Sequence, residues 1–127
     1  MRNGKLVVLI VDDNRDVLTL IFCATSRIGF ETICAADGYE ALGKITGEID
    51  LIITDCNMPG MTGPEFEEKA RRLTKAPIIG FTGLQKLATP EMRSKFDAFL
   101  LKPIRLKELV YSIHKTLGLL SVLLKFP

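Results

Sequence analysis

With 127 residues, 47% of them hydrophobic and 25% charged, the chain has the length and composition of one globular domain. These values exclude a disordered tail and a low-complexity linker, and a chain of this length can bury a core without a metal or a disulfide. The formal net charge of +2 is too balanced to indicate direct nucleic-acid binding, for which a clustered basic face is typical.

The sequence carries no signal for export or for membrane insertion. The apolar run Leu6–Val11 is too short for a signal peptide, and no stretch reaches the length of a membrane span. The three cysteines, Cys23, Cys34 and Cys56, form no CxxC pair, and a single histidine, His114, makes a zinc site improbable. We therefore expect a cytoplasmic protein with three buried free thiols, and a His114 on the surface of the last helix.

Short apolar runs alternate with segments of helical spacing along the whole chain. The first half predicts a strand at Leu6–Val11, a helix capped by Asn14 and stopped by Gly29, a strand at Glu31–Ala35, a helix from Asp37–Gly38 to Gly47 and a strand at Leu51–Thr54. The apolar positions of the first of these helices are Val17, Leu18, Ile21, Phe22 and Ile28.

The second half of the chain continues the alternation after a loop at Asn57–Gly63. It predicts a helix with Pro64 in its first position, a strand at Pro77–Phe81, a weaker helix near Pro90–Lys95, a strand at Ala98–Leu101 and a helix from about Arg105 to Leu117. Strands that alternate with helices predict a parallel sheet, and wholly apolar strands indicate that helices cover both of its faces.

Polar side chains stand where the predicted strands end. Asp12 and Asp13 follow the first strand, Asp55 the third, Thr82 the fourth and Lys102 the fifth. Because ligands bind outside the carboxyl ends of parallel strands, we expect these side chains to converge on one edge of the sheet. Three carboxylates there need compensating charge, which a lysine and a hard divalent ion such as Mg²⁺ can supply. A carboxylate in such a place can also act as a nucleophile toward phosphorus.

Four motifs coincide with these strand ends. They are Val-Asp-Asp-Asn at 11–14, Thr-Asp-Cys-Asn-Met-Pro-Gly-Met-Thr-Gly at 54–63, Phe-Thr-Gly at 81–83 and Leu-Lys-Pro-Ile at 101–104. In this order they resemble the signatures of the response regulator receiver domain of two-component signalling, of the CheY-like superfamily. The resemblance implies a doubly wound, flavodoxin-like α/β fold with a five-stranded parallel sheet in the order 2-1-3-4-5 and five flanking helices. It covers about Lys5 to Leu117, so residues 1–127 are expected to form a single receiver domain with an apolar C-terminal tail at 118–127.

The resemblance also implies roles for the acidic residues. Asp55 matches the phosphoacceptor, which would take a phosphoryl group from a histidine kinase or phosphotransfer protein. Asp12 and Asp13 match the acidic pair that holds Mg²⁺ together with Asp55, and Asn57 would lend its backbone carbonyl to the metal. The cofactor expected from the resemblance is therefore Mg²⁺.

The remaining family positions concern the switch. Thr82 matches the hydroxyl residue that hydrogen-bonds the phosphoryl group, and Lys102 matches the lysine that pairs with its oxygens. Phe99 stands where the family carries a switch aromatic, although it could equally be an ordinary core residue. The resemblance implies a cis peptide bond at Lys102–Pro103 and a partner-binding surface made by the fourth helix, the fifth strand and the fifth helix. A phosphorylation-dependent homodimer is a further possibility that it leaves open.

The sequence departs from the family pattern in several places. Gly83 follows Thr82 where the family usually has alanine, and the missing methyl group should ease access to the phosphoryl site. Lys95 and Phe96 occupy a loop that is usually small and contains glycine. The tail Leu119–Phe126 is more apolar than a stand-alone receiver requires, and could fold back on the domain or form a self-association face.

Two classes of function follow from this inventory. The first is a signalling switch that catalyses only its own phosphorylation and dephosphorylation and is not otherwise an enzyme. The second is a Mg²⁺-dependent phosphohydrolase with an aspartate nucleophile, which would carry Asp-x-Asp after its first strand, where this chain has Asp12-Asp13-Asn14. A pseudo-receiver that only binds partners is disfavoured because all five site residues are present. The local sequence around Asp55 and around Lys102 resembles receivers of hybrid sensor kinases. A receiver excised from a larger kinase or regulator is therefore an alternative to a single-domain regulator.

Overall fold

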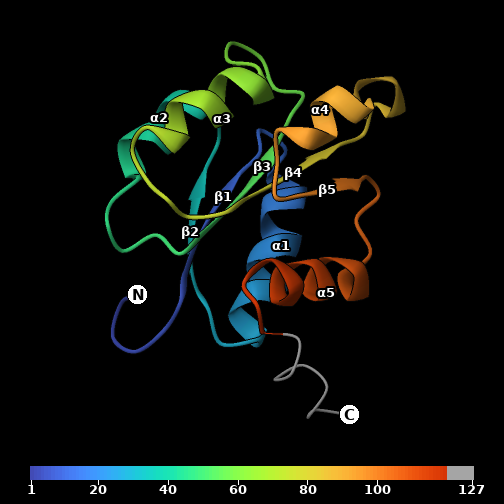
Figure 1. The fold of residues 1–127 in the computed structure, drawn as a ribbon. Coiled ribbons are helices and arrows are strands. Elements are labelled where there is room, and N and C mark those ends of the chain that lie inside the picture. The colour runs from blue at the N-terminus through green and yellow to red at the C-terminus, as the bar shows by residue number, and fades with distance from the viewer. Residues whose placement is uncertain (120–127) are drawn as a thin grey trace.

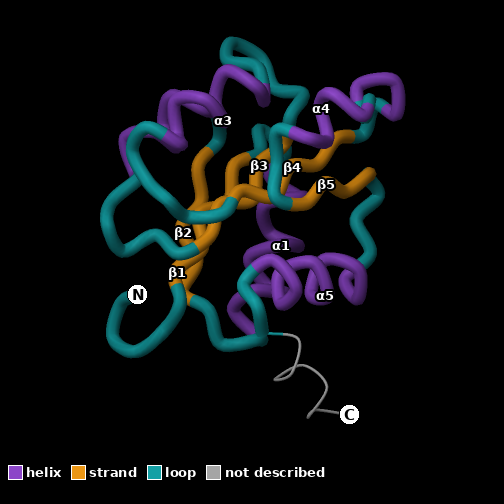
Figure 2. The backbone as a smooth tube through the Cα atoms, viewed as in Figure 1, coloured by secondary structure: helices purple, strands orange, loops and turns teal. Residues whose placement is uncertain are grey.

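The computed structural model describes residues 1–119, and its five strands form one parallel sheet in the order β2-β1-β3-β4-β5 (Figures 1 and 2). In chain order the strands are β1 (Val7–Val11), β2 (Glu31–Ala35), β3 (Leu51–Asp55), β4 (Ile78–Thr82) and β5 (Ala98–Leu101). Every neighbouring pair is parallel. The predicted fold class and strand order are confirmed, and each strand lies within one residue of its predicted bounds.

Helices cover both faces of the sheet, as the wholly apolar central strands require. The helices α1 (Arg15–Arg27) and α5 (Leu106–Thr116) lie on one face, and α2 (Gly38–Lys44), α3 (Gly63–Arg71) and α4 (Pro90–Ser94) lie on the other (Figure 1). The strands β1, β3 and β4 are buried along their whole length, whereas the edge strands β2 and β5 are partly exposed. A one-turn 3-10 helix at Gln85–Leu87, which the sequence did not predict, precedes α4.

Side-chain caps fix where the helices begin, and so fix the loops that carry the polar residues. The Asn14 side chain accepts hydrogen bonds from Asp16 N and Val17 N, as predicted. Thr62 caps the start of α3, where its Oγ1 accepts a hydrogen bond from Glu65 N at 3.2 Å and donates one to the Glu65 carboxylate. Because Thr62 is the cap, Pro64 is the second residue of α3 and not the first.

Two helix predictions need correction. The helix α2 ends at Lys44, because Ile45 adopts an extended conformation, so the helix stops one turn before Gly47. In α1 the side chain of Phe22 is 43% exposed instead of facing the core, because the buried stripe of this helix runs through Ile21, Ala24 and Thr25. Ile28 follows α1 as its C-terminal cap.

The predictions for the cysteines and the histidine are partly wrong. Cys56 is buried, but Cys34 is half-buried and Cys23 is exposed, because Cys23 shares the outward side of α1 with Leu20 and Arg27. His114 is only 8% exposed, and its Nδ1 lies 2.8 Å from the carbonyl oxygen of Val110, one helical turn earlier. The imidazole therefore folds back on its own helix instead of reaching solvent.

The C-terminal part of the described chain contains two further features. The Lys102–Pro103 peptide bond is cis, as the resemblance implied. No helix within residues 1–119 is long and apolar enough to cross a membrane. The apolar tail is predicted at 118–127, and residues 120–127 of it lie outside the described part of the structure.

Candidate functional site

Three carboxylates meet at the carboxyl edge of the sheet. Asp12 and Asp13 follow β1, and Asp55 is the last residue of β3. The two strands are neighbours, with Val11 opposite Thr54, so the loop after β1 comes beside the end of β3. One oxygen from each of the three carboxylates lies within 4.8 Å of the others, with Asp12 and Asp55 buried and Asp13 exposed. The predicted convergence of these side chains is confirmed.

Lys102 is the cation of this cluster. It follows β5, and its Nζ lies 3.1 Å from Oδ2 of Asp12 and 3.1 Å from Oδ2 of Asp55. Its side chain is 23% exposed, and its ammonium also lies 5.2 Å from the centre of the Phe81 ring. Phe81 belongs to the predicted fourth strand and to the motif at 81–83, but no sequence signal predicts that its ring lies beside the lysine.

Backbone amides hold the two buried carboxylates in place. Oδ1 of Asp12 accepts a hydrogen bond from Asn14 N at 2.8 Å, and Oδ1 of Asp55 accepts one from Asn57 N at 2.9 Å. Oδ2 of Asp12 is buried without a hydrogen-bond partner among residues 1–119, although the Lys102 ammonium stands beside it. Each Oδ2 therefore points toward the shared centre while its sister oxygen is fixed by the loop.

Burial dominates the electrostatics of the cluster. It raises the pKa of Asp12 to about 6, and the nearby Asp55 charge adds to the rise, while the Asn14 amide and Lys102 oppose it. Burial works to lower the pKa of Lys102, but the hydrogen bonds and charges of the two carboxylates outweigh it, so that the pKa lies above its ordinary value. The cluster is thus short of positive charge at neutral pH, as a cation-binding site would be.

The other predicted site residues lie around this cluster without all joining it. Thr82 is buried at the end of β4, one residue beyond Phe81, which stands opposite Asp55 in the sheet, and its Oγ1 accepts a hydrogen bond from Leu84 N at 3.1 Å. Asn57 is exposed in the loop after β3. Phe99 is half-buried in β5, three residues before Lys102.

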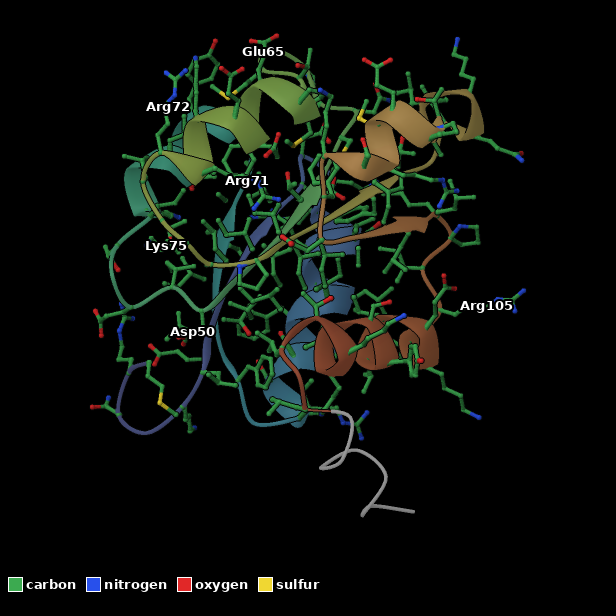
Figure 3. The ribbon with its side chains drawn as sticks, viewed as in Figure 1. Asp50, Glu65, Arg71, Arg72, Lys75 and Arg105 are labelled. Atoms are coloured by element: carbon green, nitrogen blue, oxygen red, sulfur yellow. The ribbon has the colours of Figure 1, made fainter. Side chains whose placement is uncertain are left out.

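A hollow of about 600 Å³ lies at the opposite edge of the sheet, where Figure 3 labels Asp50, Arg71 and Lys75 among its lining residues. Arg71 is already engaged there, because it forms ion pairs with Glu67 and Asp97. Arg71 therefore joins α3 to the loop just before β5. The candidate site is instead the carboxylate edge, where buried carboxylates pair with a single lysine among the described residues and the shifted pKa values are found.

Comparison with known proteins agrees with the geometry. The family model of the response regulator receiver domain matches residues 8–114. The chain belongs to this family. It is therefore a two-component signalling module, and its acidic pocket and Lys102 occupy the receiver's usual edge of the sheet.

Individual relatives place the receiver in several kinds of protein. The chain is 34% identical over 122 residues to the sensor histidine kinase GacS of Pseudomonas protegens, covering 88% of this chain and 13% of GacS. It is 31% identical over 104 residues to the uncharacterized transcriptional regulatory protein YrkP of Bacillus subtilis, covering 80% of this chain and 45% of YrkP. The chain thus spans less than half the length of these curated relatives.

A solved structure of the response regulator TrrA from Thermotoga maritima, in complex with Mg²⁺ and BeF, is similar in fold and sequence. It superposes with a TM-score of 0.79 at 30% identity, covering 87% of this chain and 98% of TrrA. In the present chain, the three converging carboxylates, including the buried Oδ2 of Asp12, offer the oxygen donors that Mg²⁺ prefers. The residues of this site therefore fit a magnesium ion.

Proposed function

We propose that Asp55 accepts a phosphoryl group from a histidine kinase or phosphotransfer protein in a Mg²⁺-dependent reaction, and that the phosphorylated receiver changes its affinity for a downstream protein. The observation that carries this proposal is the position of Asp55 Oδ2, 3.1 Å from the Lys102 ammonium, in a cluster whose carboxylate oxygens lie within 4.8 Å of one another. A nucleophilic carboxylate, a fixed cation and a metal site are the parts that phosphoryl transfer requires.

The chemistry assigned to the protein is mainly positioning. A carboxylate oxygen of Asp55 forms a bond to phosphorus while the bond from phosphorus to the donor imidazole breaks, and the imidazole leaves with that electron pair. Lys102 neutralises charge on the transferred oxygens, and the Thr82 hydroxyl, whose oxygen accepts a hydrogen bond from Leu84 N, donates its proton to one of them. The donor's phosphoryl group is therefore consumed once per receiver, and no small substrate is turned over.

We assign the metal ligands to carboxylates of Asp12, Asp13 and Asp55 and to the backbone carbonyl of Asn57. Bound Mg²⁺ would supply positive charge against the oxygens of the transferring group. Asp13 is the exposed member of the set, so it can exchange water for a metal contact at low cost, whereas Asp12 is held by the Asn14 amide.

Millimolar Mg²⁺ should stabilise the protein, because the metal binds the folded site and not the unfolded chain. At a concentration about 100 times the Kd the gain in free energy of unfolding is about 3 kcal/mol, and EDTA should abolish it. Thermal unfolding with and without Mg²⁺ measures the effect. Asp13→Asn should lose most of the Mg²⁺-dependent shift, while Glu68→Gln, which changes an exposed carboxylate on α3, should keep it. An equal shift in both variants would contradict the assignment of Asp13.

Phosphorylation is proposed to act through Thr82 and Phe99 on the surface formed by α4, β5 and α5. Phe99 lies at the border of this surface and has no hydroxyl group. A change in its position can therefore affect a partner only through packing contacts and not through a hydrogen bond of its side chain. The downstream partner, or a second copy of this chain, would bind there in the phosphorylated state.

Gly83→Ala should lengthen the lifetime of the phosphorylated state several-fold. A Cβ at this position would lie 3.7 Å from Cδ of Lys102, which is an ordinary contact, so an added methyl group fits and shields the phosphoryl site from water. The decay of the phosphoryl adduct, followed by intact-mass spectrometry, measures the lifetime. Gly43→Ala on the exposed side of α2, where a Cβ meets nothing within 4 Å, is the matched control. A faster decay in Gly83→Ala would contradict the shielding role.

The architecture of the complete protein is also a proposal. Because the chain matches a segment of both a sensor kinase and a transcriptional regulator, we infer a receiver that either acts as a single domain or forms part of a larger kinase or regulator. In both cases residues 1–127 are proposed to form one domain.

Intact-mass spectrometry after incubation with acetyl phosphate and Mg²⁺ tests the proposed function. A single phosphoryl adduct that EDTA prevents supports the receiver switch. Absence of an adduct would favour a pseudo-receiver that only binds partners. Steady release of phosphate from many phosphate esters would instead favour the phosphohydrolase.

A further inference from the structure

The residue next to the proposed acceptor is held between two glycines. Cys56 follows Asp55 directly, and a Cβ added to Gly63 at the start of α3 would lie 2.6 Å from Cβ of Cys56. A Cβ added to Gly80 in β4 would lie 3.1 Å from Sγ of Cys56. Such short separations mean that the backbones of α3 and β4 touch the cysteine side chain directly, so Cys56 has no free space on either side.

An aromatic ring from a distant loop completes this contact. Phe96, in the loop between α4 and β5, is 7% exposed, and its Cγ and Cδ1 atoms would lie 2.9 Å from a Cβ on Gly80. The Phe96 ring thus covers the place on the sheet where a side chain of residue 80 would stand. Cys56 and Phe96 share this place, and both belong to the core cluster on the α2–α3 face.

The same ring contacts the edge of the partner-binding surface. Phe96 and Phe99 have ring centroids 5.6 Å apart with planes tilted by 56°. Phe99 stands opposite Gly80 in the sheet, and the guanidinium of Arg93, in α4, lies 5.5 Å from the centre of its ring. Phe96 N also donates to the carbonyl of Arg93 at 3.2 Å. A series of neighbouring groups therefore runs from Cys56, across the face of Gly80, to Phe96 and on to Phe99 and Arg93.

We propose that Phe96 is a positioning residue that couples the acceptor end of β3 to Phe99 and α4. This inference rests on the proposed function of Asp55, and it adds a second connection to the one through Thr82. A displacement of residues 55–56 on phosphorylation would reach Phe96 at the face of Gly80, where Cys56 Sγ and the Phe96 ring both lie within 3.1 Å of the position of a Cβ. A buried ring in close contact transmits such a shift to its neighbour instead of absorbing it.

Fluorine NMR of protein labelled with fluorophenylalanine tests the coupling. The Phe99 signal is assigned by its loss in Phe99→Leu, and beryllium fluoride with Mg²⁺ serves as the phosphoryl mimic. In the wild-type chain the Phe99 signal should shift on addition of the mimic. In Phe96→Leu this shift should fall to less than half, while the acetyl phosphate adduct on Asp55 still forms in full by mass spectrometry. A role in stability alone would leave the mimic-dependent shift of Phe99 intact in the folded variant.

Two further variants keep the test decisive. Gly80→Ala retains the Phe96 ring but pushes it off the sheet, so the Phe99 shift should again be reduced, even if Phe96→Leu does not fold. Phe30→Leu removes a half-buried ring from the core on the other face and should leave the shift unchanged. An undiminished Phe99 shift in Phe96→Leu or Gly80→Ala, with the adduct present, overturns this inference alone. Absence of any adduct on the wild-type chain overturns the proposed function and this inference with it.

Discussion

Asp55→Asn should abolish the phosphoryl adduct that acetyl phosphate and Mg²⁺ produce on the wild-type chain. The amide has nearly the shape of the carboxylate and can still accept the hydrogen bond from Asn57 N, so the fold is retained. It lacks the negative charge that makes the oxygen a nucleophile and a metal ligand. Intact-mass spectrometry measures the adduct, and thermal unfolding in the absence of Mg²⁺ confirms that the variant is folded.

The matched control is Asp16→Asn, which changes an exposed carboxylate in the first turn of α1 and should leave the adduct at its wild-type level. An adduct of undiminished stoichiometry on Asp55→Asn would mean that another carboxylate is the acceptor. Asp12 and Asp13 would then be the residues to exchange next, since their oxygens share the cluster.

Lys102→Met should lower the free energy of unfolding at neutral pH by about 3 kcal/mol, near the low end of the cost of breaking a buried ion pair. The lysine is the cation nearest to both buried carboxylates, at 3.1 Å from each, and methionine keeps the length of its apolar stem. Because the Lys102 side chain is partly exposed, we expect a cost at the low end of the range for buried ion pairs. Denaturant unfolding in the absence of Mg²⁺ measures the change, and Lys86→Met, at an exposed position before α4, should cost far less.

The destabilisation of Lys102→Met should shrink as the solution is acidified. The folded-state pKa of Asp12 is about 6 against an ordinary value of 3.8, so the folded protein binds the additional proton first. The contribution of Asp12 to the free energy of unfolding therefore increases as the pH falls through about 6 towards 3.8, and decreases as the pH rises. Without Lys102 the pKa of Asp12 rises further above 6, so the variant binds this proton at a higher pH than the wild type does. The difference in free energy of unfolding should therefore narrow as the pH falls from neutral towards about 6. A difference that widens on acidification would show that the lost ion pairs do not cause the effect.

Much of the fold could be predicted because its determinants are local. The apolar runs set the strands, and Asn14 and Asp37 cap helices whose first turns lie next to them in the sequence. The end of α2 could not be placed, because Ile45 continues the apolar spacing of a helix while its backbone is already extended toward β3. The outward position of Cys23 and the inward position of His114 depend on which side of each helix meets the sheet, and the apolar pattern leaves such neighbouring positions undecided.

The candidate site could be predicted further than most surfaces because parallel strands bring their carboxyl ends to one edge. This rule placed Asp12, Asp13, Asp55 and Lys102 together, and the distances agree. The contact of Phe96 with Gly80 could not be predicted, because it depends on how a loop folds over a strand distant in sequence. The sequence signals for such a contact are Gly80 within an apolar strand and Phe96 in a loop that is usually small, and neither signal identifies the other residue as its partner.

The placement of Lys102 directly after the last strand bears on how the chain folds. The three strands that carry the carboxylates or pair with them come from residues 7–55, and the cation that balances the charge arrives almost fifty residues later with β5. An intermediate with only β1, β2 and β3 in place would hold its carboxylates against one another without the lysine. Closure of the β5 edge relieves that repulsion, so the two halves of the sheet are expected to form and melt as one cooperative unit.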